Sequence, residues 1–254
     1  MTAHTRTQPG PAVHHDPDHT GAQNPRLALP RLPRHRWAFN TFTLGRVHDH
    51  VVVKSALTSL WGADPHFIHQ LYEGNIGARH LELGTLASAF LSHSLDAHSN
   101  RVQQVHLLDH DPIPVRACAR RVRAHGYTPD LHVLDPRTRW PLAVGGLDSV
   151  ASVMWTHTLP CPNRDLIFHQ VARVLAPGGR FFGAAVVGPL GPGADPLTAR
   201  ARRRRALYNR LGLFHNLNDT KRTYHHLLTR AFGPRSEVHT RLVSAVVLWE
   251  VTLR

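Results

Sequence analysis

The chain has 254 residues and a formal net charge of +13, and 42% of its residues are hydrophobic. This length and apolar content suffice for one large domain, or two small ones, with a sizeable core. The sequence contains no run of 18 apolar residues and no basic start followed by an apolar stretch. It therefore predicts neither a membrane span nor a secretory signal, and we expect a cytoplasmic protein.

The positive charge is almost entirely arginine, with lysine only at Lys54 and Lys221. Its densest run, "ARARRRRALYNR" at 199–210, is compatible with a phosphate-binding stripe or with the solvated face of a helix. We favour the solvated face, because no aromatic interleaving or nucleic-acid motif accompanies the run.

No metal site or disulfide framework is predicted. Residues 1–36 are rich in Pro, His and small polar residues, so we expect a disordered tail. The "HHDPDH" cluster within it lacks fixed geometry and would bind a metal only weakly. Cys118 and Cys161 are too few for a disulfide framework and have no metal-ligand spacing.

After this tail, apolar residues recur at helical spacing. The spacing predicts two helices, at about 45–61 and 64–73. Beyond Gly77, short apolar runs alternate with longer helical ones. One such helix is "PIPVRACARRVRAHG", with Pro112 at its start and Gly126 just past its end. The runs that predict strands are "ARHLEL", "VQQVHLL", "DLHVL", "LDSVASVM" and "GRFFGAAVV".

Alternating strands and helices imply a parallel sheet covered by helices on both faces. The last segment, "SEVHTRLVSAVVLWEVTLR", instead predicts two adjacent strands in an antiparallel hairpin. We therefore expect one α/β domain over residues 37–254, with a Rossmann-like, doubly wound, seven-stranded sheet. Within it, residues 37–77 form a helical cap and residues 189–225 a lid or insertion, whose hinge is "VVGPLGPGADP".

Acidic residues end three successive predicted strands. Glu82 and Gly84 close the first, Asp109 closes the second about 25 residues later, and Asp135 closes the third. Because ligands of doubly wound sheets lie beyond the carboxyl ends of the strands, this pattern favours a nucleotide-type pocket.

Each of these acids also has a simpler interpretation. Glu82 is compatible with an ordinary loop carboxylate, Asp135 before Pro136 with a turn former, and Asp111 with a helix N-cap. One such residue would mean little, but three in register at one edge of the sheet are typical of a ligand site.

Five stretches resemble class I S-adenosylmethionine (SAM) dependent methyltransferases in order and spacing over residues 45–254. They are "HLELGTLASAF", "VHLLDHDPIPV", "HVLDP", "LDSVASVMWTHTLP" and "VARVLAPGGRFFGAAVV". In addition, "YNRLGLFHNLND" at 208–219 resembles a segment of a subfamily of microbial small-molecule methyltransferases.

The resemblance implies SAM as cofactor and assigns its contacts to the strand ends. Glu82 and Gly84 would border the methionine end, and Asp109 would take the ribose hydroxyls. The adenine would lie beside His110, Asp135 and Pro136, with Asp135 accepting from the amino group.

The loop after the first strand departs from the family pattern, because its second and third glycines are replaced by Leu86 and Ser88. Glycine there allows positive φ and close approach to the ligand. A strained Leu86 would cost on the order of 1 to 3 kcal/mol and weaken binding roughly 5- to 150-fold. If Leu86 instead has an ordinary φ and turns into the helix packing, SAM still fits. Leu86→Gly is expected to tighten SAM binding if the pocket is otherwise intact, and no gain would mean that Leu86 lies clear of the cofactor or that the site has decayed elsewhere.

The resemblance places His157, after the fourth strand, where it faces the acceptor. It would serve either as a general base, since its ordinary pKa is near 7, or as part of the pocket wall. Four residues of the 189–225 segment are candidate acceptor contacts, although their spacing also suits packing: Tyr208, Asn209, Phe214 and Asn216.

The function we expect is therefore methyl transfer from SAM to a small molecule in specialised metabolism, with a homodimer or a partner methyltransferase subunit as the expected assemblies. Leu86 and Ser88 favour an alternative, in which the fold has lost methyl transfer and acts as a SAM-independent cyclase or isomerase, or as a non-catalytic partner of an active methyltransferase. A nucleic-acid substrate is not expected, because "MWTHTLP" stands where an "NPPY"-type motif would be.

Overall fold

The computed structural model describes residues 56–254, except residue 144 and residues 189–195. The predicted tail, most of the first predicted helix and most of the Gly/Pro-rich hinge lie outside these ranges. Seven strands form one sheet in the order β3-β2-β1-β4-β5-β7-β6, in which β7 runs antiparallel to both neighbours. The strands are β1 Arg79–Leu83, β2 Gln104–Asp109, β3 Asp130–Val133, β4 Leu147–Val153, β5 Leu175–Val186, β6 Ser236–Val243 and β7 Val246–Leu253.

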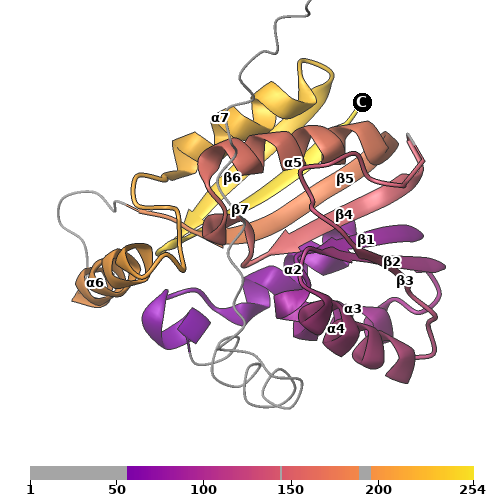
Figure 1. The fold of residues 1–254 in the computed structure, drawn as a ribbon, viewed down its shortest axis with the longest axis horizontal. Coiled ribbons are helices and arrows are strands. Elements are labelled where there is room, and N and C mark those ends of the chain that lie inside the picture. Colours follow the sequence, from indigo (N-terminus) through magenta and orange to yellow (C-terminus); the bar gives the residue numbers. More distant parts are fainter. Residues whose placement is uncertain (1–55, 144, 189–195) are drawn as a thin grey trace, which may run out of the picture.

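Helices cover both faces of the sheet, as predicted (Figure 1). Three of the described α-helices cover one face, two cover the other, and one lies at one end of the sheet, while residues 56–60 form a short π-helix. The first group is α2 Pro65–Asn75, α3 Ser88–Ala97 and α4 Pro112–Ala124; the second is α5 Cys161–Val174 and α7 Lys221–Phe232; the last is α6 Pro196–Arg210. Two short 3-10 helices follow β1 and β4, namely η2 Thr85–Ala87 and η3 Thr156–Thr158. The prediction of a doubly wound sheet with a C-terminal hairpin is confirmed.

Local sequence signals set the helix boundaries. The Asp111 side chain accepts from Ile113 N at 2.9 Å, and Pro112 follows as the first residue of α4. Gly126, just beyond that helix, has φ +85, which L side chains rarely adopt. Thr220 and Thr223 bond each other's backbone N–H in a capping box at the start of α7. Asp111 is thus the N-cap that its simpler interpretation suggested.

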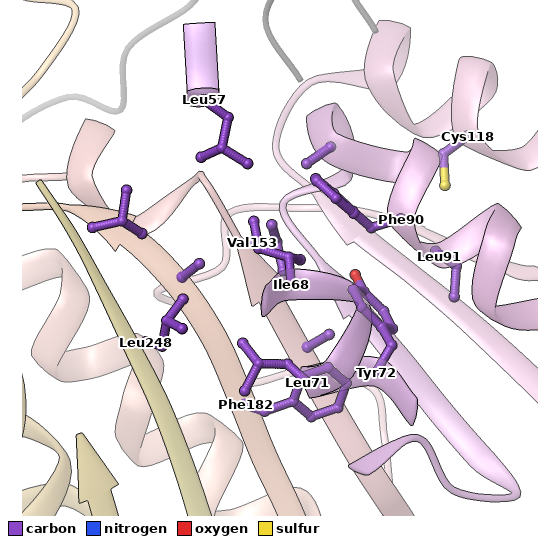
Figure 2. Close-up of a cluster of buried hydrophobic side chains, with 14 of the residues drawn as sticks. Leu57, Ile68, Leu71, Tyr72, Phe90, Leu91, Cys118, Val153, Phe182 and Leu248 are labelled. Atoms are coloured by element: carbon purple, nitrogen blue, oxygen red, sulfur yellow. The ribbon is translucent and has the colours of Figure 1, made fainter. Parts of the chain in front are cut away.

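The core on the α2 face is continuous from helix to sheet. Figure 2 shows Ile68, Leu71 and Tyr72 of α2 directed at Val153 and Phe182 of the sheet. The Tyr72 and Phe182 rings meet edge to face, with centroids 5.0 Å apart. Burying side chains of this size stabilises by about 1.5 to 3 kcal/mol each, so α2 is part of the domain core.

The two edges of the sheet differ. β6 alternates exposed with half-buried residues along its length, which suits a strand with one solvated face. At the other edge β3 has four residues, and its Leu131 and Val133 are 40% and 49% exposed.

Strand β5 is longer than predicted. It begins at Leu175 rather than Gly179, so "LAPGG" belongs to the strand. The pairing with β4 shifts register between Leu147 and Ser149, and Gly178 has φ +78. A glycine with positive φ lets a strand bulge without ending it, which period-2 apolar patterning does not reveal.

None of the described helices has the length and apolar content needed to cross a bilayer.

Candidate active site

The loop after β1 turns at Gly84. Its φ is +79, and a Cβ there would lie 2.2 Å from Cγ of the buried Trp155. The Gly84 N–H donates to Leu108 O at 3.0 Å, which fixes the turn against β2. The backbone angle and the contact with Trp155 both disfavour any residue other than glycine here.

Leu86 follows in the 3-10 helix η2 and is half-buried. The non-glycine residues with positive φ in the described part of the chain are Met154 and Ser244, so Leu86 has an ordinary backbone. The strain considered for Leu86 is absent, and of the second expected arrangement the structure shows the ordinary φ. The missing glycines therefore do not by themselves exclude a ligand.

Asp109 at the end of β2 is 1% exposed and oriented by backbone donors. Its Oδ2 accepts from Thr85 N at 3.0 Å, and its Oδ1 accepts from Asp111 N at 3.2 Å. His110 Nδ1 lies 3.0 Å from Oδ1. The second neighbour of Oδ2, the Thr85 hydroxyl, lies 3.5 Å away, which is too far for a strong hydrogen bond, so this oxygen retains capacity for a ligand hydroxyl.

Asp135 is engaged by its own neighbour. Arg137 Nε lies 2.9 and 3.0 Å from the two carboxylate oxygens, and Nη2 lies 2.5 Å from Oδ2. The hydrogen bonds from Arg137 lower the pKa of the Asp135 carboxyl below its ordinary value. The expected role of Asp135 as acceptor for the adenine amino group conflicts with this geometry, because both oxygens already accept from a guanidinium.

Glu82 lies on β1 beneath α2 rather than in the loop. The Tyr72 hydroxyl lies 3.0 and 2.9 Å from its two carboxyl oxygens, and both side chains are fully buried. Burial raises the pKa of Glu82 to about 8, partly offset by the Tyr72 hydrogen bond. Glu82 is therefore mostly neutral at pH 7 and joins α2 to the sheet.

His157 lies in η3, 2% exposed, at the carboxyl ends of β4 and β5. The Val186 N–H donates to its Nδ1 at 3.4 Å, and its backbone oxygen accepts from His215 N at 2.9 Å. Its ring meets the Phe214 ring nearly at right angles, with centroids 4.3 Å apart.

Three aromatic side chains next to His157 pack on one another. Phe214 packs on Tyr208 with a centroid separation of 5.0 Å and on Trp61 with a separation of 5.9 Å. Trp61 and Tyr208 are 6.4 Å apart. We call His157, Phe214, Tyr208 and Trp61 the aromatic wall. The structure thus brings together three of the predicted site residues, with Trp61 as an unpredicted fourth.

Asn209 and Asn216 bond each other. Asn209 Nδ2 donates to Asn216 Oδ1 at 2.8 Å, and Asn216 N donates to Asn209 Oδ1 at 3.1 Å. The remaining amide donors bind backbone oxygens, Asn209 Nδ2 that of Arg205 and Asn216 Nδ2 that of Val186. These two predicted acceptor contacts therefore hold the segment between them against β5.

Sequence analysis missed two features of this end of the sheet. Met154, just after β4, has φ +54, an uncommon conformation for a non-glycine residue that is often found at functional sites. Arg164 of α5 is fully buried and bonds the Asp219 carboxylate through Nη1 and Nη2. Neither carries a local sequence signal, since each depends on contacts with distant segments.

A metal centre finds no support in the described residues, where no group of three or more His, Cys, Asp or Glu side chains is placed to hold an ion.

The fold is Rossmann-like, and Asp109 and the aromatic wall both lie at the edge of the sheet formed by the carboxyl ends of its parallel strands. A family model described as a methyltransferase domain matches residues 81–179. Demethylluteothin O-methyltransferase of Streptomyces thioluteus is 28% identical over 206 residues, which are 80% of this chain and 84% of the relative. N-methyltransferase vrtF of Penicillium aethiopicum is 28% identical over 199 residues, 76% of this chain and 77% of the relative.

Among solved structures, the cyclase SpnF matches with a TM-score of 0.55 and 14% identity, over 89% of this chain and 98% of its own. That likeness concerns the fold alone. The family model shows a methyltransferase domain over residues 81–179, and the two relatives, the motifs and the strand order agree with a class I SAM-dependent methyltransferase. The predicted family and its cofactor, SAM, are thereby confirmed.

Proposed function

We propose that this methyltransferase acts on a small-molecule acceptor in specialised metabolism, and that the acceptor lies against the aromatic wall. The observation that carries the proposal is the position of that wall at the carboxyl ends of β4 and β5, which are two and three strands from β2, where Asp109 lies. Cofactor and acceptor sites in doubly wound sheets lie at this edge. The names of the two relatives, an O- and an N-methyltransferase, agree with a small acceptor.

The residues present fit the cofactor at one point and not at another. The buried Asp109 retains acceptor capacity for the ribose hydroxyls, while the close approach at Gly84 is taken by Trp155. Asp135 does not present a free carboxylate, so we assign the adenine contact to backbone groups beside His110 and Pro136. When bound, SAM supplies an activated methyl group, so the protein's task is to orient the acceptor and exclude water.

His157 acts in our proposal as a positioning residue. Its Nδ1 accepts from Val186 N–H, so the neutral ring carries its proton on Nε2 and has no second acceptor site for a substrate proton. Its edge contact with Phe214 instead sets the shape of the wall. His157→Asn retains an acceptor for Val186 N–H and should keep kcat within about tenfold with an unchanged pH profile. Loss of a base would cost about 10²- to 10⁴-fold.

The SAM-independent alternative loses its main physical support, because the ordinary backbone of Leu86 removes the expected strain. Calorimetric titration with SAM and S-adenosylhomocysteine (SAH), followed by product detection with a panel of phenols, carboxylates and amines, tests the proposal. Micromolar SAH binding together with methylation of any panel member would support it. No SAH binding at millimolar concentration, by a protein that melts cooperatively, would refute it.

A further inference from the structure

Arg205 is a buried arginine on α6, 7% exposed, in the middle of an otherwise solvated arginine run. Its neighbours Arg202, Arg203 and Arg204 are exposed. The expectation of a solvated helix face therefore holds for most of the run but not for Arg205. Burying a guanidinium has a large desolvation cost unless another charge or a set of acceptors compensates it.

The described residues do not provide that compensation. Arg205 Nε and Nη1 are both buried and have no hydrogen-bond partner. Asp219 is the carboxylate that acts on Arg205 electrostatically, but its two oxygens are already bonded by Arg164. Two buried guanidinium groups thus share one carboxylate, which leaves one positive charge in excess at this place.

A glycine leaves room for the Arg205 guanidinium. It lies against Gly188, just beyond the end of β5, where a Cβ would be 1.4 Å from Arg205 Nη1. The Gly188 N–H is fixed by Asp219 O at 2.7 Å. Any side chain at position 188 would displace Arg205, so the backbone leaves this volume open for the guanidinium.

Arg205 also lies next to the aromatic wall. It is one helical turn before Tyr208 on α6, and residues three apart share a helix face. On the sheet side, Gly188 is two residues beyond Val186, whose N–H contacts His157. A buried cation therefore stands at the margin of a planar, apolar surface.

We propose that Arg205 binds an anionic oxygen group, a carboxylate or a phosphate, on an acceptor whose planar part packs on the aromatic wall. This inference rests on the proposed function and narrows its substrate class. The guanidinium presents paired N–H donors that match the oxygens of such a group, and the bound anion would neutralise the excess charge. The cofactor's own carboxylate is a second source of the same chemistry, which the experiment below separates.

The test uses the full-length protein and three probes of similar size: benzoate, phenyl phosphate and the neutral benzyl alcohol. Dissociation constants are measured by calorimetry with and without saturating SAH. Wild type should bind at least one of the anions about tenfold or more tightly than benzyl alcohol, as expected for a charge-assisted hydrogen bond. Arg205→Met and Arg205→Gln should remove that preference. Arg203→Gln, which removes an exposed arginine of the same helix, should keep it.

A separate titration with SAH alone tests the proposed function. Failure of the proposed function and failure of the Arg205 proposal therefore give different results. If Arg205→Met weakens SAH binding tenfold or more, the guanidinium serves the cofactor's carboxylate and our assignment is wrong. It is also wrong if wild type shows no preference for either anion, or if the Arg205 variants retain the preference.

Thermal melting of the unliganded protein gives a readout independent of any probe. Removing an uncompensated buried charge while keeping an apolar stem should leave the Tm of Arg205→Met unchanged or raised. A Tm lower by more than about 4 °C would mean that the guanidinium stabilises the fold, contrary to the proposal.

Discussion

The backbone N–H of Thr85 donates a hydrogen bond to Asp109 Oδ2 at 3.0 Å, and this bond ties the loop after β1 to the end of β2. The two segments are 24 residues apart in the chain but are joined at the edge of the sheet where ligands bind. A carboxylate held in this way is oriented before any ligand arrives.

Asp109→Asn should weaken SAH binding about 10- to 100-fold. The change keeps the side chain's size but replaces one carboxylate oxygen by a donor and removes the charge that strengthens its hydrogen bonds. Calorimetric titration measures the effect. Asp130→Asn, at an exposed acid at the start of β3, is the matched control and should leave affinity unchanged. Equal affinity of Asp109→Asn and wild type would show that the ribose contact lies elsewhere.

Gly84→Ala and Gly126→Ala form a pair that separates backbone strain from packing. Both glycines have strongly positive φ, +79 and +85, but the added Cβ meets Trp155 only at Gly84 and has nothing within 4 Å at Gly126. Gly126→Ala should cost about 1 to 2 kcal/mol in free energy of unfolding. Gly84→Ala should cost at least about 2 kcal/mol more, because Trp155 must move. Urea denaturation measures both, and equal losses would contradict the Trp155 contact.

Leu86→Gly should not tighten cofactor binding, since Leu86 has an ordinary φ and stores no strain that glycine would relieve. Glycine in a helical segment should instead destabilise the protein by about 0.5 to 1 kcal/mol. SAH titration and urea denaturation of the same variant check both statements. A fivefold or larger gain in affinity would show that the leucine side chain overlaps the ligand.

Glu82→Gln should change how stability depends on pH. Burial raises the pKa of Glu82 to about 8, above its ordinary value of 4.5, so the folded state retains a proton that the unfolded state loses. The stabilisation is complete below pH 4.5 and is lost as pH rises toward 8, at a slope of up to about 1.4 kcal/mol per unit.

His80 acts in the opposite direction, because burial lowers its pKa to about 3 from 6.5 and stability is lost as pH falls through that range. The two groups oppose each other between pH 4.5 and 6.5, so the clearest window for Glu82 is pH 6.5 to 8. There the unfolding free energy of wild type should fall relative to that of Glu82→Gln, whose amide oxygen still accepts from Tyr72. Parallel curves for the two proteins would mean that Glu82 is ionised at pH 6.5.

Apolar periodicity and capping residues predicted the sheet and the helix boundaries well, because local patterns such as Asp111-Pro112 and Gly126 directly determine those features. Strand-end chemistry located Glu82, Asp109 and His157 on the right elements. What their side chains bond to was not predictable, because the partners lie on other segments: Tyr72 for Glu82 and Val186 for His157.

The excess charge at Arg205 illustrates the same limit. The composition of an arginine run does not show whether one of its side chains is buried. The burial of Arg205 depends on the contact between α6 and Gly188, the glycine after β5. The choice between a strained and an ordinary backbone at Leu86 was open in the sequence for a related reason, since it depended on the 3-10 turn that gives leucine a negative φ.

The reciprocal bonds between Asn209 and Asn216 span the segment that carries Phe214. Without them, fixing that segment around an acceptor would cost about 1 to 2 kcal/mol per ordered residue in lost chain entropy. The amide pair makes that ordering part of folding, so an incoming acceptor meets a surface that is already assembled and its intrinsic affinity is not reduced by the ordering step.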